Sequence, residues 1–235
     1  MEIATQLLIY TSILGFILGF VVTKTNFCTM GAVSDWVNIG DLSRFKAWMF
    51  AAAVAILGVT ILDFMSFFDI NDSRIPYRNS VLAWPRYMLG GLMFGVGMTY
   101  ASGCGNKVLI RVGGGNLKSL IVLFVAGLMA YIMTRTDFYG IVFHSWMNPI
   151  SLDLAKIGIL DQSLPTIVSS VFSITNSVYF NFTIGLTVSL TMIFLIFKSG
   201  KFIKNFDNVI SGFVVGSIVV FAWLLTGGAT GVEWI

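Results

Sequence analysis

The stretch GGLMFGVGMTYASGCGNKVLIRVGGGNLKSL, residues 90–120, combines the two signals that organise this chain. Its first part is apolar with spaced glycines, as expected of a helix that packs closely against another helix in a membrane. Its centre is a glycine-flanked cysteine, Cys104, followed by Lys107, Arg111 and a run of glycines. Because glycine is unfavourable inside a helix, the stretch predicts an apolar helix that ends in a polar turn at Cys104.

The rest of the chain is equally apolar. Of its 235 residues, 57% are hydrophobic and only 11% are charged, whereas a soluble domain has about 25% charged residues. Apolar runs long enough to cross a bilayer core of about 30 Å recur along the sequence. We expect six spans, at residues 6–23, 47–68, 84–102, 117–135, 177–197 and 208–226. The fold class predicted is all-α, a polytopic bundle of membrane helices.

The basic residues are unevenly divided between the two sides of such a bundle. With simple alternation of the spans, nine fall on one side and five on the other. The larger group consists of Lys24, Arg44, Lys46, Lys107, Arg111, Lys118, Lys198, Lys201 and Lys204. Since basic residues favour the cytoplasmic side, we expect the side with nine basic residues to be cytoplasmic. Both the N-terminus and the C-terminus would then lie outside.

The spacing of glycines indicates an internal repeat. Gly15, Gly19 and Cys28 are spaced like Gly91, Gly95 and Cys104, and like Gly212, Gly216 and Leu225. An odd number of spans separates the first copy from the third, so the third would cross the membrane in the opposite direction, as in many transporters. This predicts an inverted-topology repeat, with residues 1–204 as the first repeat and 205–235 as the start of an incomplete second repeat. The alternative is that glycine pairs are simply a common device for helix packing.

The incomplete second repeat has a structural consequence. The helix at 208–226 carries Gly212 and Gly216 on one face, which allows close backbone approach. Its repeat-related partner lies beyond residue 235. We therefore expect this face to contact lipid or a second chain.

Both cysteines follow apolar helices and precede predicted short helices at 29–37 and 105–112. Irregular backbone at membrane depth is tolerated only where protein buries it or where it lines a cavity, which predicts short re-entrant segments. Helix N-termini favour anions, and a thiol is a weak donor and a soft partner for sulfur. The predicted substrate-binding residues are Cys28, Cys104, Gly31, Gly103, Gly105, Lys107, Arg111, Asn26 and Asn116.

Simpler interpretations of these residues remain open. A cysteine in a membrane helix is often a small packing residue, and Lys107 and Arg111 fit ordinary cytoplasmic charges. Asn116 fits a helix N-cap, and Asp35 fits a hydrogen bond to a helix end. With a single histidine, His144, in the sequence, we expect neither a metal site nor a cofactor.

The segments NFCTMGAVSDW, residues 26–36, and 90–120 resemble the YeeE/YedE family of bacterial inner-membrane proteins. That family is associated with uptake of thiosulfate and related sulfur compounds. The resemblance implies an hourglass-shaped helical bundle with inverted pseudo-symmetry, in the inner membrane, whose cysteines pass an anion along through S–H···S contacts. By motif, Cys28 and Cys104 take the cysteine positions of the first half, whereas Leu225 stands where the second half would repeat Cys28.

The resemblance implies transport of a small sulfur-containing anion, thiosulfate first, without covalent chemistry and without enzyme activity. Another sulfur species or a selenium compound is compatible with the same motifs. Two alternatives are a membrane sulfurtransferase that forms a cysteine persulfide, and a non-transporting half or assembly subunit. The expected partners are the anion, the lipid bilayer, a second membrane chain or oligomer and a soluble sulfur-carrier protein, with no nucleic acid.

Overall fold

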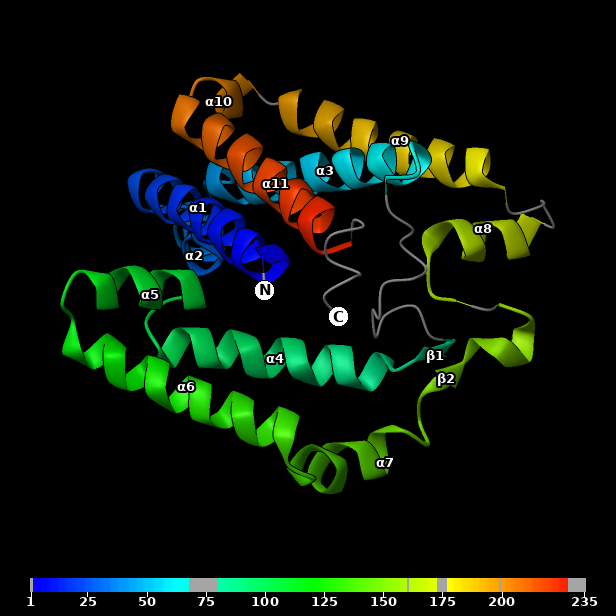
Figure 1. Ribbon diagram of the computed structural model, residues 1–235, viewed down its shortest axis with the longest axis horizontal. Helices are drawn as coiled ribbons and strands as arrows, with labels where there is room; N and C mark the ends of the chain where they lie inside the picture. The colour runs from blue at the N-terminus through cyan, green and yellow to red at the C-terminus, as the bar shows by residue number, and fades with distance from the viewer. Residues whose placement is uncertain (1, 68–79, 160, 173–176, 199, 228–235) are drawn as a thin grey trace. The chain divides into compact units, whose positions relative to one another are not determined.

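The computed structural model describes residues 2–67, 80–159, 161–172, 177–198 and 200–227 (Figure 1). The described residues are helical apart from turns and two strands of two residues each. The chain forms two compact units, Met1–Ile75 with Ser173–Ile235, and Pro76–Phe172.

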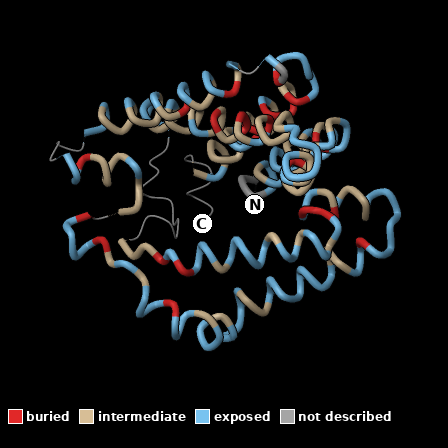
Figure 2. Tube along the Cα trace, turned by 180° about the vertical axis from the view of Figure 1, so that it is seen from behind, coloured by how far each residue is buried: buried red, intermediate tan, exposed pale blue. Residues whose placement is uncertain are grey.

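The first unit is a bundle of helices. It contains α1 (Glu2–Thr25), α2 (Thr29–Ile39), α3 (Ser43–Phe64), α9 (Val178–Phe197), α10 (Gly200–Ile203) and α11 (Phe206–Gly227). Its core lies where α3 meets α9 and α10, around Phe50, Ile196 and Phe202. Phe50 packs edge-on against Phe197 and Phe202, with ring centroids 5.3 and 6.0 Å apart. Figure 2 shows buried residues concentrated in these packed helices, while much of the remaining surface is exposed.

The contact between α3 and α11 depends on glycine. A Cβ at Gly216 would lie 2.6 Å from the carbonyl oxygen of Ala51, and one at Gly212 would lie 2.8 Å from that of Ala47. The prediction that this face has no partner within the chain is therefore wrong. The partner is α3, whose alanines let the two backbones approach, and not the helix that the repeat spacing designates.

The second unit combines helices with two short strands. Its elements are β1 (Val81–Leu82), α4 (Trp84–Tyr100), α5 (Gly105–Gly113), α6 (Leu117–Arg135), the π-helix η2 (Gly140–His144), α7 (Ser145–Met147), β2 (Leu152–Asp153), the 3-10 helix η3 (Leu154–Ile157) and α8 (Leu164–Phe172). The two strands pair antiparallel, Val81 opposite Asp153 and Leu82 opposite Leu152. Trp84 Nε1 also donates to the carbonyl oxygen of Ile150 at 3.1 Å. These contacts fasten the segment after α6 to the start of α4.

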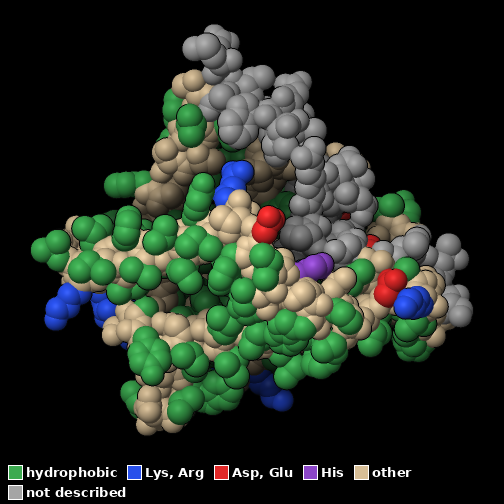
Figure 3. Space-filling view, turned by 90° about the horizontal axis from the view of Figure 1, so that it is seen from below, with side chains coloured by type: hydrophobic (Ala, Val, Ile, Leu, Met, Phe, Trp, Pro, Cys, Tyr) green, Lys and Arg blue, Asp and Glu red, His purple; other side chains and the backbone are tan. Residues whose placement is uncertain are grey.

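Five helical segments in the described part of the chain are long and apolar enough to cross a membrane: Thr5–Ile39 (most of α1 together with α2), Ser43–Phe64, Leu117–Arg135, Val178–Phe197 and Phe206–Gly227. Figure 3 shows hydrophobic side chains over much of the face it draws, as expected of a surface in contact with lipid. The prediction of a helical, multi-pass membrane protein is confirmed. The third predicted span, 84–102, is not among these five helices, because α4 has only 17 residues and ends at Tyr100. The inverted repeat stays a prediction.

Candidate functional site

Both cysteines lie in the same kind of turn between a long helix and a short one. Asn26 and Ser102, each two residues before a cysteine, adopt the left-handed conformation, with φ of 52° and 55°. The next N–H then donates to the carbonyl five residues back, at 3.2 Å in the first turn and 3.1 Å in the second. This bond and the left-handed residue define a Schellman motif, which ends a helix by satisfying its last carbonyls. Both long helices therefore end in the same way.

Each cysteine is then the N-cap residue of the short helix. Its backbone is extended, with φ −152° and ψ 128° at Cys28 and φ −71° and ψ 168° at Cys104. Its carbonyl accepts the first helical hydrogen bond, from the N–H of Ala32 at 2.9 Å and of Val108 at 3.0 Å. The predicted short helices are confirmed as α2 and α5. Each thiol therefore lies at a helix N-terminus, where backbone N–H groups without helical partners favour an anion.

The short helices cannot cross a bilayer alone. With 11 residues in α2 and 9 in α5, a rise of about 1.5 Å per residue gives lengths of about 16 and 14 Å. This is about half of the hydrocarbon thickness. Their length is compatible with segments that enter the membrane without traversing it.

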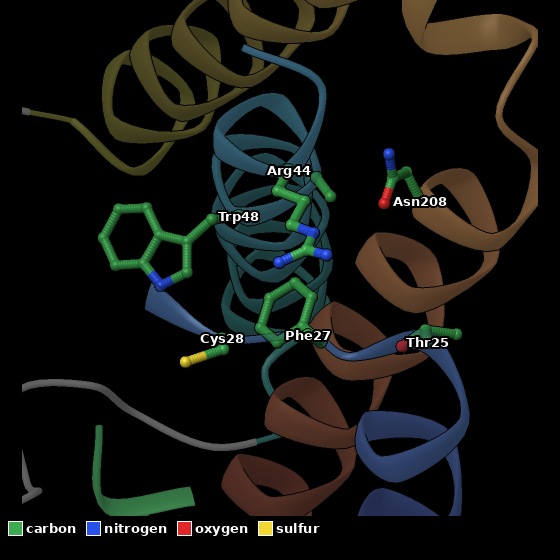
Figure 4. Close-up of a pocket in the computed structure, with 7 residues that line it drawn as sticks. Thr25, Phe27, Cys28, Arg44, Trp48 and Asn208 are labelled. Atoms are coloured by element: carbon green, nitrogen blue, oxygen red, sulfur yellow. The ribbon is translucent and has the colours of Figure 1, made fainter. Parts of the chain in front are cut away.

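A pocket lies beside Cys28 in the first unit (Figure 4). It is lined by Thr25, Phe27, Cys28, Arg44, Ala47, Trp48 and Asn208. These residues come from the turn between α1 and α2, from α3 and from α11. The pocket contains about 210 Å³ of space between atoms, in gaps too narrow for a water-sized sphere. As it stands, the pocket is closed.

Arg44 connects this pocket to the first turns of α2. Its Nε lies 3.2 Å from Asp35 Oδ2, forming an ion pair. A Cβ at Gly31 would lie only 2.9 Å from Arg44 Nη1, so the absence of a side chain at Gly31 leaves room for the guanidinium. Sequence reasoning assigned Arg44 to the cytoplasmic charges and missed this position. The signal that could have found it is that Arg44 and Trp48, four residues apart on α3, share one helix face.

The turn at Cys104 has its own basic residues. Cys104 is 5% exposed, and Arg111 Nη1 donates to the carbonyl oxygen of Ser102 at 2.8 Å. A Cβ at Gly103 would lie 3.0 Å from the Cβ of Lys107. The side chains of Lys107 and Arg111 therefore lie next to Gly103, beside Cys104.

The remaining predicted residues fall into three situations. Asn26 is exposed and supplies the left-handed residue of the first turn. A Cβ at Gly105 would meet no atom within 4 Å, and the φ of this residue is not positive, so its environment does not require glycine. Asn116 is the N-cap of α6, and its side-chain oxygen accepts from the Ser119 N–H at 3.2 Å. Among the described residues, no group of three or more His, Cys, Asp or Glu could hold a metal ion.

Residues 24–235 match the protein family described as sulphur transport. The chain belongs to the sulphur transport family. This confirms the family resemblance of the two cysteine-containing segments.

Two relatives carry the same functional name. The thiosulfate transporter TsuA of Escherichia coli (strain K12) is 31% identical over 129 residues, which are 55% of this chain and 35% of the relative. The thiosulfate transporter TsuA of Spirochaeta thermophila (strain ATCC 700085 / DSM 6578 / Z-1203) is 28% identical over 125 residues, 53% of this chain and 36% of the relative. The matched region thus spans about a third of the length of each relative.

Proposed function

We propose that this chain takes part in the membrane transport of a small sulfur-containing anion, with thiosulfate as the first candidate, and that Cys28 and Cys104 contact the anion. The observation that carries the proposal is the shared turn geometry, which places a thiol at the N-terminus of a short helix twice. Membership of the sulphur transport family supports the substrate class. The names of the two relatives favour thiosulfate.

The chemistry of thiosulfate fits these turns. The anion has a soft terminal sulfur and a cluster of oxygens, so a thiol can meet the first while N–H groups and cations meet the second. Contact through S–H···S leaves the anion unchanged, which is what transport requires. Basic residues lie at both turns: Arg44 lines a pocket with Cys28, and Arg111 donates to the carbonyl oxygen of Ser102, two residues before Cys104.

The proposal is tested by uptake of radiolabelled thiosulfate into membrane vesicles that contain the chain, with sulfate as competitor. We expect saturable uptake that sulfate inhibits only weakly, because sulfate has no soft sulfur for the thiols. Strong inhibition by equimolar sulfate would contradict a sulfur-selective site.

We also propose that α2 and α5 are re-entrant segments, in an inner-membrane protein whose N-terminus faces outward. If so, membrane-impermeant thiol reagents added on the cytoplasmic side should label Cys28 and Cys104 slowly. Fast, complete labelling from that side would make both turns surface loops.

A further inference from the structure

We propose that Arg44 and Asn208 complete an anion site with Cys28, in which the guanidinium and the amide bind oxygens of a sulfur oxyanion while the thiol meets its terminal sulfur. This inference rests on the proposed function and assigns it a specific pocket in the first unit. In this site, Arg44 and Asn208 supply affinity for any oxyanion, and Cys28 supplies the preference for an anion with a terminal sulfur.

Arg44 is placed to act as the cation of this site. Asp35 engages its Nε, which leaves the two terminal nitrogens of the guanidinium fork as further donors. A Cβ at Gly31 would have both Arg44 Nη1, at 2.9 Å, and Cys28 Cβ, at 3.6 Å, as its nearest neighbours. The guanidinium and the Cβ of Cys28 therefore border the same point above the first turn of α2.

Asn208 brings a second polar group to the pocket, from a different helix. It lines the pocket from α11 and is 6% exposed. Its side-chain amide has two N–H donors that could bind an anion oxygen. In Figure 4 the amide projects from α11 toward the side on which Arg44 lies. An anion oxygen beside Arg44 would be an acceptor for this amide.

The closed state of the pocket follows from the same residues. The gaps beside Cys28 do not admit a water-sized sphere, so an anion can enter only if a side chain moves. Arg44 is the candidate because its long side chain is 41% exposed. Moving its terminal atoms off Gly31 would open space beside Cys28 while Asp35 still holds Nε.

The first test is equilibrium binding of radiolabelled thiosulfate to the purified chain, alongside vesicle uptake. Arg44→Gln should weaken binding by about 10- to 100-fold, the usual value of a hydrogen bond to a charged group. Arg44→Lys should recover part of the loss, since it restores charge without the fork. The matched control is Lys46→Gln, which removes a charge from the same helix but lines a different hollow, with Asp41 and Phe202. We expect this control to bind as wild type.

Asn208→Leu separates a binding role from a structural one. Leucine has a similar size and replaces the polar side chain of a nearly buried residue with an apolar one, so the melting temperature should stay the same or rise. Thiosulfate affinity should nevertheless fall several-fold. If Asn208 had only a structural role, Asn208→Leu would instead lower the melting temperature and leave the thiosulfate affinity unchanged.

The outcomes separate this inference from the proposed function. Unchanged affinity in Arg44→Gln and Asn208→Leu would overturn the site, even if uptake continued to depend on Cys28. If thiosulfate binding depends on Arg44 but no uptake occurs, the result would support the site and contradict the proposal that this chain transports the anion. A wild-type chain that binds no thiosulfate would overturn the site outright. If Arg44→Gln does not fold, the thiosulfate affinity of Asn208→Leu tests the site instead.

Discussion

The turns at Cys28 and Cys104 share a left-handed residue and an extended N-cap cysteine, but their positive charge comes from different helices. At Cys104, Lys107 and Arg111 lie on α5, the helix that the cysteine itself begins. At Cys28, the corresponding helix α2 contributes the acidic Asp35, and the cation comes from α3 as Arg44. One turn is thus built from a continuous segment, whereas the other needs a neighbouring helix.

The difference shows that local backbone and local charge are specified separately. A left-handed residue and a cysteine N-cap suffice for the turn, because both act within a few residues. The charge can be supplied from any element that packs nearby. The turn at Cys28 should therefore depend on the packing of α3 against α11, and the turn at Cys104 should not.

The largest effect is expected from Gly212→Leu. A Cβ at this position would lie 2.7 Å from Phe50 Cδ1 and 2.8 Å from the Ala47 carbonyl oxygen. Overpacking of this kind costs about 1–3 kcal/mol or more, so the melting temperature should fall. Alkylation of Cys28 should become faster while Cys104 reacts at the wild-type rate.

The control for this substitution is Gly19→Leu, since nothing lies within 4 Å of a Cβ at Gly19. It should change neither melting temperature nor alkylation. Equal acceleration at both cysteines in Gly212→Leu would show that the two turns are not independent.

The next largest effect concerns the thiols. Cys28→Ser and Cys104→Ser replace a soft group by a harder one of similar shape, so the fold should survive. Thiosulfate uptake should fall by about tenfold or more in each variant, the value of one hydrogen bond to a charged ligand. Uptake near wild type in both variants would exclude the thiols from the mechanism.

Arg111→Gln should affect only the second turn. It removes the hydrogen bond from Arg111 Nη1 to the Ser102 carbonyl oxygen. Because Arg111 is only half-buried, we expect a local loss of about 1 kcal/mol, seen as alkylation of Cys104 several-fold faster. Cys28 should react as in wild type, the reverse of Gly212→Leu. A change confined to Cys28 would contradict the separate supply of charge.

The smallest effect is expected from alanine at the two glycines nearest the cysteines. Gly31→Ala would push the Arg44 guanidinium aside, since the new Cβ would lie 2.9 Å from Nη1. The terminal atoms can move, so thiosulfate affinity should fall only about two- to fivefold, within the range for one perturbed polar contact. Gly105→Ala meets no atom within 4 Å and should bind as wild type. Similar losses in both variants would remove the special role of Gly31.

Much of the local structure could be predicted from the sequence. An apolar run followed by polar and glycine residues predicts the end of a helix. A residue with a left-handed φ then ends that helix, and the cysteine two positions later is the N-cap of the next one. Gly115, with φ of 83°, and Asn116 similarly separate α5 from α6. The extent of the third span was not predictable to the residue, because the turn at Ser102 ends α4 at Tyr100.

Five of the membrane helices, the two cysteine turns and the charge at Cys104 can thus be predicted from sequence alone, because each depends on residues within a few positions of one another. Only the tertiary structure placed Arg44 and Asn208 beside Cys28 and gave Gly212 its partner. Those contacts arise from the close packing of α3 with α11, two helices far apart in the chain. The fit of small residues between two backbones determines such packing, and the spacing of residues along a sequence does not record it.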